Sequence, residues 1–363
     1  MIPMARPVLG DREEELVLEV LRSGRLSLGP MLPRFEQAFA DFLGVEHCSA
    51  VSSGTAGLHL ALRAVGVEAG DEVVTSPFSF VASANVILYE GARPVFADID
   101  PVTFNLDPDA ARAAVTERTK ALLPVHIFGA PAAIPRLETL GLPIVEDACE
   151  ALGAQHPDGS PVGTSGHQAV FAFYANKQMT TGEGGMVVSP DAETKARIDA
   201  ERNQGRAPDM GWLDHDRLGF NYRMTDLQCA LGIAQLERVR DMMAGRERVA
   251  AQYREALAGA DVTLPADLPG RSWFVFVVQL PHGVDRDETI RALRARGVDS
   301  KPYLPAIHLF AYYRERFGHR PGEFPVAEDI AARSIALPFF PQMTEGEVAQ
   351  VAEALGAVVR RAA

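Results

Sequence analysis

The sequence predicts an α/β protein with a large domain on a mostly parallel seven-stranded sheet and a smaller C-terminal α+β domain. Over the first two-thirds of the chain, short apolar runs alternate with segments of helix length. Such alternation is typical of βαβ units, whose helices cover both faces of a parallel sheet. The order of elements then changes, and 363 residues are enough for two domains. We therefore expect a large domain over residues 1–240 and a small domain over residues 241–363.

The elements of the large domain follow one another in a regular order. Candidate strands are the apolar runs at 48–52, 72–76, 93–98, 121–126, 143–146, 169–174 and 186–189. Candidate helices between them are 55–65, 80–89, 108–115 and 132–140. Ligands of such sheets bind at the carboxyl ends of the strands. Polar side chains that directly follow these strands are therefore the first candidates for a functional site.

A longer helix opens the last third of the chain, and we place the domain boundary in it. Thr225-Asp226-Leu227-Gln228 matches a capping box, and an apolar stripe continues from Leu227 to about Met243. A strand at 273–280 and a helix at 287–296 follow. A second capping box at 344–347 introduces a C-terminal helix.

Composition and charge narrow the class of protein. The chain is 47% hydrophobic and 23% charged, as in ordinary soluble proteins. A net charge of -13 argues against general binding to nucleic acid or anionic membranes, although local arginines can still hold an anionic substrate. Cys48, Cys149 and Cys229 include no close pair, which suits a reducing compartment and predicts no metal site. Without an apolar signal segment at the start, a cytoplasmic protein is expected.

Two strand ends carry residues with distinctive chemistry. Lys177 follows the run 169–174 in a loop of small and polar residues. A partly desolvated lysine there can attack a carbonyl carbon, whereas a solvated loop lysine is the simpler interpretation of such a residue alone. Asp147 ends the run 143–146, where an acid needs a partner. A pyridinium nitrogen is one such partner, and an exposed acid at a turn is the alternative.

Two further segments are suited to binding an anion. Gly54 allows a tight turn after the first strand, and the helix that follows presents N–H groups and a positive dipole end. This turn has neither nucleotide-binding glycine pattern, and an ordinary helix cap is the alternative. Asn221 and Arg223 precede the long helix and are within reach of an anionic group, unless they belong to a solvated loop.

The order of these segments distinguishes between the candidate chemistries. A phosphate seat, then an acid, then a lysine within one α/β domain is the order of fold-type-I enzymes that use pyridoxal 5'-phosphate (PLP). A Schiff-base aldolase is more often a (β/α)₈ barrel and has no need of Asp147. A serine hydrolase of α/β fold would carry Gly-x-Ser-x-Gly, and Ser165 and Gly166 do not form that motif.

At these motifs the chain resembles the DegT/StrS family of PLP-dependent sugar aminotransferases, which have the aspartate-aminotransferase fold. The resemblance covers nearly the whole chain. It is carried by Ser53-Gly54-Thr55-Ala56, Glu146-Asp147-Ala148, Asn176-Lys177, Asn221-Tyr222-Arg223-Met224 and Pro302-Tyr303. Many family members have a serine at the position of Ala172 that bonds the cofactor phosphate, and this chain lacks that donor.

The resemblance implies a role for each matching residue. Lys177 is expected to hold the cofactor as a Schiff base and to move the proton during catalysis, while Asp147 keeps the pyridine nitrogen protonated. The remaining contacts with the cofactor are implied for Gly54, Thr55 and Ala56 at the phosphate, Phe80 on the ring face, and Glu150 near the ring hydroxyl. Asn221 is expected to reach the cofactor phosphate of a neighbouring subunit, so the site needs a homodimer. Contacts with the substrate are implied for Tyr303, His308, Arg223 and Lys301.

The function implied is transfer of an amino group from an amino acid, L-glutamate being expected, to a keto sugar linked to a nucleotide. The sugar is a 4-keto-6-deoxyhexose or a 3-keto sugar. A keto-cyclitol aminotransferase and a non-catalytic regulator with the same fold are the alternatives. A dehydratase is disfavoured because such relatives replace the lysine by histidine. The choice of acceptor is expected to depend on loops around Ser27, Met210 and residues 303–313.

Overall fold

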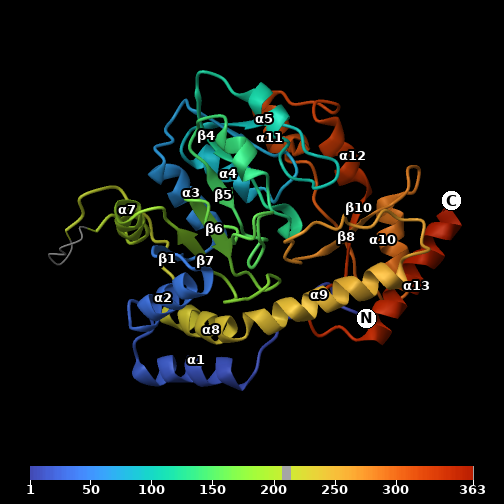
Figure 1. Cartoon of the computed structure of the whole chain (residues 1–363), viewed down its shortest axis with the longest axis horizontal. Helices are drawn as coiled ribbons and strands as arrows, with labels where there is room; N and C mark the ends of the chain where they lie inside the picture. The colour runs from blue at the N-terminus through green and yellow to red at the C-terminus, as the bar shows by residue number, and fades with distance from the viewer. Residues whose placement is uncertain (207–213, 363) are drawn as a thin grey trace.

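The computed structural model describes residues 1–206 and 214–362, with side chains through residue 360 (Figure 1). The helices are α1 (Asp11–Ser23), α2 (Met31–Leu43), α3 (Gly54–Ala64), α4 (Ala82–Tyr89), α5 (Pro108–Ala114), α6 (Ile134–Glu138), α7 (Ala192–Arg202), α8 (Asp226–Glu237), α9 (Val239–Ala256), α10 (Arg286–Ala295), α11 (Ala311–Phe317), α12 (Pro325–Arg333) and α13 (Glu345–Ala362). The strands are β1 (Cys48–Val51), β2 (Glu72–Thr75), β3 (Arg93–Phe96), β4 (Thr119–Leu123), β5 (Val145–Asp147), β6 (Gln168–Ala172), β7 (Gly185–Val188), β8 (Phe276–Gln279), β9 (Lys301–Pro302) and β10 (Ser334–Leu337).

The seven strands predicted for the first part of the chain form two adjoining sheets. One has the order β1-β7-β6-β5 and the other β3-β2-β4. Isolated parallel bridges, Leu122 with Ile144 and Val125 with Asp147, join β4 to the β5 side. The pairs β5–β6, β2–β3 and β2–β4 are parallel, whereas β7 is antiparallel to both β1 and β6. The mostly parallel α/β architecture is confirmed, with β7 as the antiparallel member.

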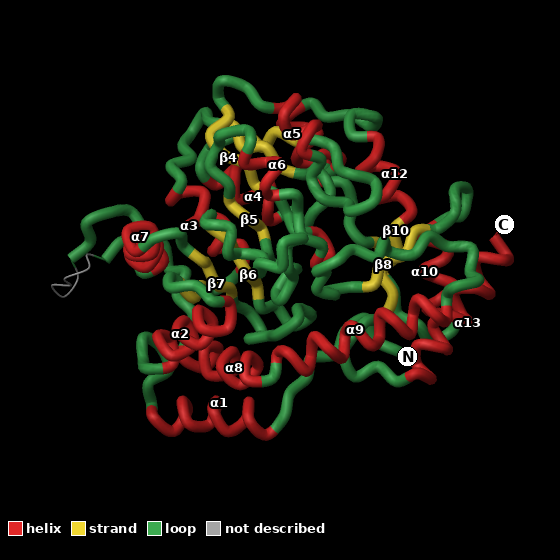
Figure 2. Tube along the Cα trace, in the orientation of Figure 1, coloured by secondary structure: helices red, strands yellow, loops and turns green. Residues whose placement is uncertain are grey.

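Apolar side chains on both faces of the strands explain why helices cover this sheet. Every residue of β1, β2, β5 and β7 is buried. Helix α3 packs against β6, β7 and α4, and most of its residues are buried. On the other side, α8 packs against α1 and α2, and these helices lie together below the strands (Figure 2). Aromatic contacts among Phe35, Phe39, Phe171 and Phe173 join α2 to β6 and fix that layer.

The last third of the chain has its own small sheet, with the order β8-β10-β9 and antiparallel pairing. Helix α9 runs from the α8 end toward α13, as Figure 1 shows, and it packs against α13. Tyr253 of α9 is completely buried and donates to the carbonyl oxygen of Pro338 at 2.7 Å. This arrangement agrees with the α+β character predicted for the region, while the boundary at residue 240 stays a prediction.

The single long helix predicted from Thr225 is in fact two helices. The capping box at Thr225 and Gln228 is present, but the helix breaks at Arg238, whose φ of -126° is not helical. The side chain of Arg238 bonds the Val8 carbonyl oxygen at 2.8 Å and Glu13, which holds the break against the N-terminal segment. No helix in the described part of the chain is both long enough and apolar enough to span a membrane.

Candidate active site

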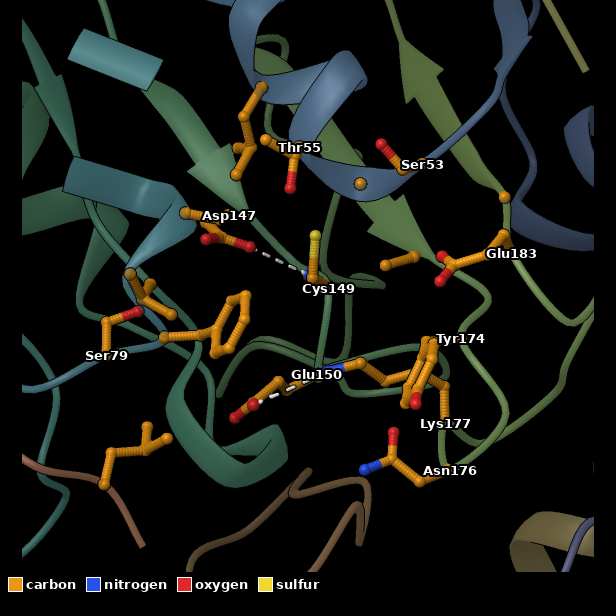
Figure 3. Close-up of a pocket in the computed structure, with 18 of the residues that line it drawn as sticks. Ser53, Thr55, Ser79, Asp147, Cys149, Glu150, Tyr174, Asn176, Lys177 and Glu183 are labelled. Atoms are coloured by element: carbon orange, nitrogen blue, oxygen red, sulfur yellow. Dashed lines mark hydrogen bonds and ion pairs between the residues drawn. The ribbon is translucent and has the colours of Figure 1, made fainter. Parts of the chain in front are cut away.

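A cavity of about 350 Å³ lies at the carboxyl ends of the strands and the N-terminus of α3 (Figure 3). Three of the four segments that the sequence singled out, those of Gly54, Asp147 and Lys177, meet here, although they are far apart along the chain. The predicted site residues that line it are Gly54, Thr55, Phe80, Asp147, Glu150, Lys177 and Tyr303. Asp147 ends β5 and Lys177 follows β6, so both strand ends open onto this one cavity, as the strand-end argument predicts.

Lys177 is held in a tight loop between β6 and β7. Its N–H donates to the Tyr174 carbonyl oxygen at 3.0 Å, and a parallel bridge between Tyr174 and Gly182 closes the loop. Only 13% of the lysine side chain is exposed. Its Nζ lies 3.5 Å from Oε1 of Glu150 and 4.0 Å from the centre of the Phe274 ring. The amine therefore sits between a carboxylate and an aromatic face, largely out of water.

Asp147 is a buried acid whose oxygens have defined partners. Its side chain is 4% exposed. Oδ2 accepts a hydrogen bond of 2.7 Å from the Ser83 hydroxyl, and Oδ1 accepts one of 3.1 Å from the Cys149 N–H. Ser83 was missed from the sequence, where it is one serine among several near Phe80. Two donors on one buried carboxylate fix its direction.

Glu150 lies across the cavity from Asp147. Oε2 accepts a hydrogen bond of 3.0 Å from the Phe128 N–H, and its backbone carbonyl accepts one from Gln178 Nε2 at 2.6 Å. Burial raises the pKa of Glu150, and the nearby Lys177 ammonium opposes that rise. Burial likewise raises the pKa of Tyr303, whose ring packs against Phe128 and Phe274. The floor of the cavity is therefore shielded from water, and Glu150 and Lys177 face each other there.

The N-terminus of α3 forms the opposite wall. The Ser53 side chain caps the helix by accepting a hydrogen bond of 3.1 Å from the Ala56 N–H. The Ala56 N–H therefore already has a partner, and Ala56 does not line the cavity. The N–H groups of a helix's first turn have no partner within the helix. Gly54 is required by close approach, because a Cβ here would lie 2.7 Å from Ala172 Cβ and 2.8 Å from Cys149 Sγ.

Asn221 and Arg223 belong to a segment beside α3 rather than to the cavity of this chain. Arg223 donates to Asn203 Oδ1 at 3.0 Å and to Gln204 Oε1 at 3.2 Å. Asn221 is exposed and forms an isolated bridge with Asn203. Lys301, on β9, is exposed and does not line the cavity. Their predicted contacts with phosphate or substrate stay predictions.

His308 is enclosed rather than open to the cavity. Its side chain is fully buried, and Nε2 lies 3.0 Å from Glu328 Oε1. Phe324 packs edge-on against the imidazole ring at 4.7 Å between centroids. Burial lowers the pKa of His308. The substrate contact predicted for this residue is therefore not formed by this arrangement of a single chain. Met210, predicted to influence the choice of acceptor, lies outside the described residues.

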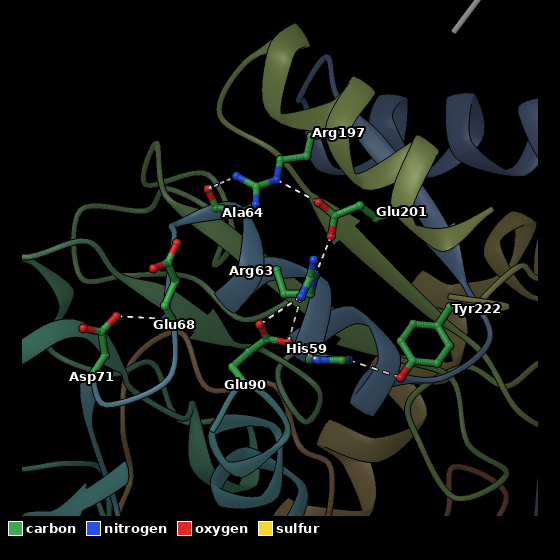
Figure 4. Close-up of polar contacts among 9 residues, drawn as sticks. All are labelled: His59, Arg63, Ala64, Glu68, Asp71, Glu90, Arg197, Glu201 and Tyr222. Atoms are coloured by element: carbon green, nitrogen blue, oxygen red, sulfur yellow. Dashed lines mark hydrogen bonds and ion pairs between the residues drawn. The ribbon is translucent and has the colours of Figure 1, made fainter. Parts of the chain in front are cut away.

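A buried polar network holds the Asn221 segment against α3 (Figure 4). His59 of α3 lies 3.1 Å from the Tyr222 hydroxyl and 2.5 Å from Glu90 Oε1. Arg63, one turn further along α3, bridges Glu90 at 2.9 Å and Glu201 of α7 at 2.6 Å. Burial lowers the pKa of His59. The helix that begins at the cavity is thus tied to α4, to α7 and to the segment that carries Asn221.

The residues present fit PLP on grounds of their own chemistry. A phosphate suits the partnerless N–H groups at the start of α3. A protonated pyridine nitrogen suits a buried carboxylate that points into the cavity (Figure 3). An aldehyde suits the amine of Lys177, which is 13% exposed at the same cavity. All three complementary groups line one cavity, so the donor set matches the group.

Comparisons with known proteins agree with this chemistry. The profile of the DegT/DnrJ/EryC1/StrS aminotransferase family matches residues 7–356. GDP-perosamine synthase of Caulobacter vibrioides is 40% identical over 369 residues, covering 99% of this chain and 98% of that protein. The crystal structure of the aminotransferase TlmJ from Streptoalloteichus hindustanus has a TM-score of 0.93 at 33% identity and covers 99% of both chains.

A third relative was solved with a reaction intermediate bound. This structure, S. venezuelae DesV in complex with a ketimine intermediate, has a TM-score of 0.89 at 34% identity and covers 95% of this chain and 93% of DesV. The family profile spans nearly the whole chain, and its members use PLP. The chain belongs to the DegT/DnrJ/EryC1/StrS aminotransferase family and is a PLP-dependent aminotransferase.

Proposed function

We propose that this enzyme moves an amino group from an amino acid, with L-glutamate as the expected donor, to a keto sugar linked to a nucleoside diphosphate. The observation that carries the proposal is the convergence of Lys177, Asp147 and the N-terminus of α3 on one cavity. The relative named GDP-perosamine synthase, 40% identical over nearly the full length of both chains, supports a nucleotide-linked sugar as acceptor.

In this proposal each residue has one task. PLP, when bound, withdraws electrons from the substrate carbon that carries the amino group. Nζ of Lys177 would take the proton from that carbon as general base and deliver it to the cofactor carbon on the other side of the transferred nitrogen as general acid. Asp147 holds the proton on the ring nitrogen. The N–H groups of Gly54 and Thr55 bind the phosphate, and the Phe80 ring covers one face of the cofactor.

We also propose a homodimer in which Asn221 reaches the cofactor phosphate of the partner. Asn221 is exposed and does not line the cavity of its own chain, which supports a contact outside it. Phe80 and Tyr174 line the cavity yet are 62% and 51% exposed. A second copy covering these rings would complete the wall. The three free cysteines support the cytoplasm as the location.

The function is tested by adding L-glutamate to the PLP-loaded enzyme and following the visible absorbance, then offering a panel of nucleotide-linked keto sugars and keto-cyclitols. Amination of a nucleotide-linked sugar is expected. Amination of cyclitols alone would replace the proposed acceptor, and absence of a spectral change with L-glutamate would exclude it as the amino donor. Lys177→Ala should abolish turnover, and Asp147→Ala should lower both PLP content and turnover. Full activity of Lys177→Ala would refute the proposed role of the lysine.

A further inference from the structure

Behind the cavity, Arg246 of α9 contacts the backbone of the lysine loop. Its side chain is almost completely buried. Nη2 donates to the Lys177 carbonyl oxygen at 3.0 Å and lies 3.4 Å from that of Asn176, while Nη1 donates to the Phe274 carbonyl oxygen at 2.9 Å. One planar group therefore joins two segments that are about a hundred residues apart in the sequence.

This guanidinium is held by carbonyl oxygens and not by an acid. Within the described residues, no carboxylate forms an ion pair with Arg246, and burial lowers its pKa to about 10. It is still charged at neutral pH. A buried cation without a counter-ion is costly, so an arginine in this position is expected only where its hydrogen bonds are needed. The Phe339 ring also lies near the guanidinium, with its centre 5.6 Å from Cζ.

Both segments that Arg246 joins contribute a side chain at the reactive amine: Lys177 carries it, and the Phe274 ring lies against it. The carbonyl of Lys177 belongs to the residue that carries Nζ. The Phe274 ring lies 4.0 Å from Nζ on one side, and Glu150 Oε1 lies 3.5 Å from it on another. A shift between the Lys177 loop and residue 274 would therefore change how far the amine stands from the ring that shields it.

We propose that Arg246 is a positioning residue for Lys177, a role that rests on the proposed function. By bonding the backbones of Lys177 and Phe274 together, it holds the amine at the place where it meets the cofactor aldehyde. The fork of an arginine suits this task because its N–H groups diverge in one plane toward several acceptors. A lysine at the same position has one ammonium on a flexible stem and serves the two segments less well.

The test compares Arg246→Met with Arg246→Lys and with a matched control, Arg271→Met. Arg271 is also a largely buried guanidinium whose pKa burial lowers to about 10. It lies 4.9 Å from the Trp273 ring and donates to the Ala266 carbonyl oxygen at 3.2 Å. Neither contact involves the lysine loop, so this variant reports the loss of an ordinary buried arginine from the same part of the chain.

The measured quantity is the rate at which the apoenzyme captures PLP on Lys177. The amine condenses with the aldehyde and one water leaves; visible absorbance follows the reaction, and borohydride reduction with peptide mapping locates the adduct. A misplacement of about 1 Å can slow a reaction on the order of 100-fold. We expect Arg246→Met to capture PLP about 10- to 100-fold more slowly and to shift the pH midpoint of the absorbance. Arg246→Lys should recover part of the rate.

A purely structural role predicts another pattern. Arg246→Met and Arg271→Met would then lose thermal stability together, while both capture PLP at the wild-type rate with the wild-type pH midpoint, and that result would overturn the inference. If Arg246→Met does not fold, a wild-type capture rate in Arg246→Lys overturns it instead. Failure of the wild-type enzyme to capture PLP at Lys177 would refute the proposed function itself, which separates the two ideas.

Discussion

The tightest contact at the cavity leads to a prediction about Gly54. This residue starts α3 shortly after β1 ends, and its backbone has no left-handed conformation that would exclude alanine. Space alone is limiting. The added Cβ of Gly54→Ala would lie 2.7 Å from Ala172 Cβ and 2.8 Å from Cys149 Sγ. Carbon atoms in contact are about 3.5–4.0 Å apart, so roughly 1 Å of room must be made.

The strain can appear in two measurable places. If the turn stays where it is, overpacking lowers the free energy of unfolding by about 1–3 kcal/mol. If α3 moves away instead, its N–H groups leave the phosphate, and the same energy appears as a PLP dissociation constant raised about 5- to 150-fold. We therefore expect the two losses together to reach about 1–3 kcal/mol.

The assay measures both quantities for the same protein, by denaturant unfolding of the apoenzyme and by fluorescence titration with PLP. Gly259→Ala is the matched control, because no atom lies within 4 Å of a Cβ at that glycine. Adding Ala172→Gly to Gly54→Ala removes the nearest clashing atom and should restore part of the loss. Unchanged stability together with unchanged PLP affinity in Gly54→Ala would refute the reasoning about close approach at the phosphate seat.

Three further predictions concern groups around the same cavity. Ser83→Ala removes the 2.7 Å hydrogen bond to Asp147; because bonds to charged groups contribute about 1.5–3 kcal/mol, PLP should bind about 10- to 100-fold more weakly, and Ser83→Thr should bind it nearly normally in a titration. Burial raises the pKa of Glu150, so the folded apoprotein binds this proton more tightly than the unfolded chain does and loses stability as pH rises through the folded pKa. The free energy of unfolding of Glu150→Gln, measured in denaturant, should therefore rise relative to that of wild type as the pH goes from acid to neutral. A difference between the two proteins that stays the same at every pH would contradict this. Equal amounts of the inactive variants Lys177→Ala and Asn221→Ala should regain about a quarter of wild-type activity on subunit exchange, since half the dimers then contain one intact site; no recovery in dimers shown to be mixed would place Asn221 in its own chain's site.

Much of the architecture and the place of the site followed from local pattern. Apolar runs of strand length indicated all seven strands of the first part, and their ends were wrong by no more than a few residues. Asp147 and Lys177 could be singled out because each follows such a run, and carboxyl ends of neighbouring strands meet at one edge. The prediction of one long helix was wrong at Arg238. The apolar stripe continues across the break, and the contacts of Arg238 with Val8 and Glu13 stabilise that break.

The sequence by itself determined the fold class, the strand ends that carry the lysine and the acid, and the turn at Gly54, because each depends on residues that are close together in the sequence. Only the tertiary structure decided which distant groups complete the site. Ser83 reaches Asp147 across 64 positions, and Phe274 and Arg246 reach Lys177 from the last third of the chain. It also enclosed His308 behind Glu328 and Phe324. Burial and hydrogen-bond partners depend on packing between segments, and no local pattern contains that information.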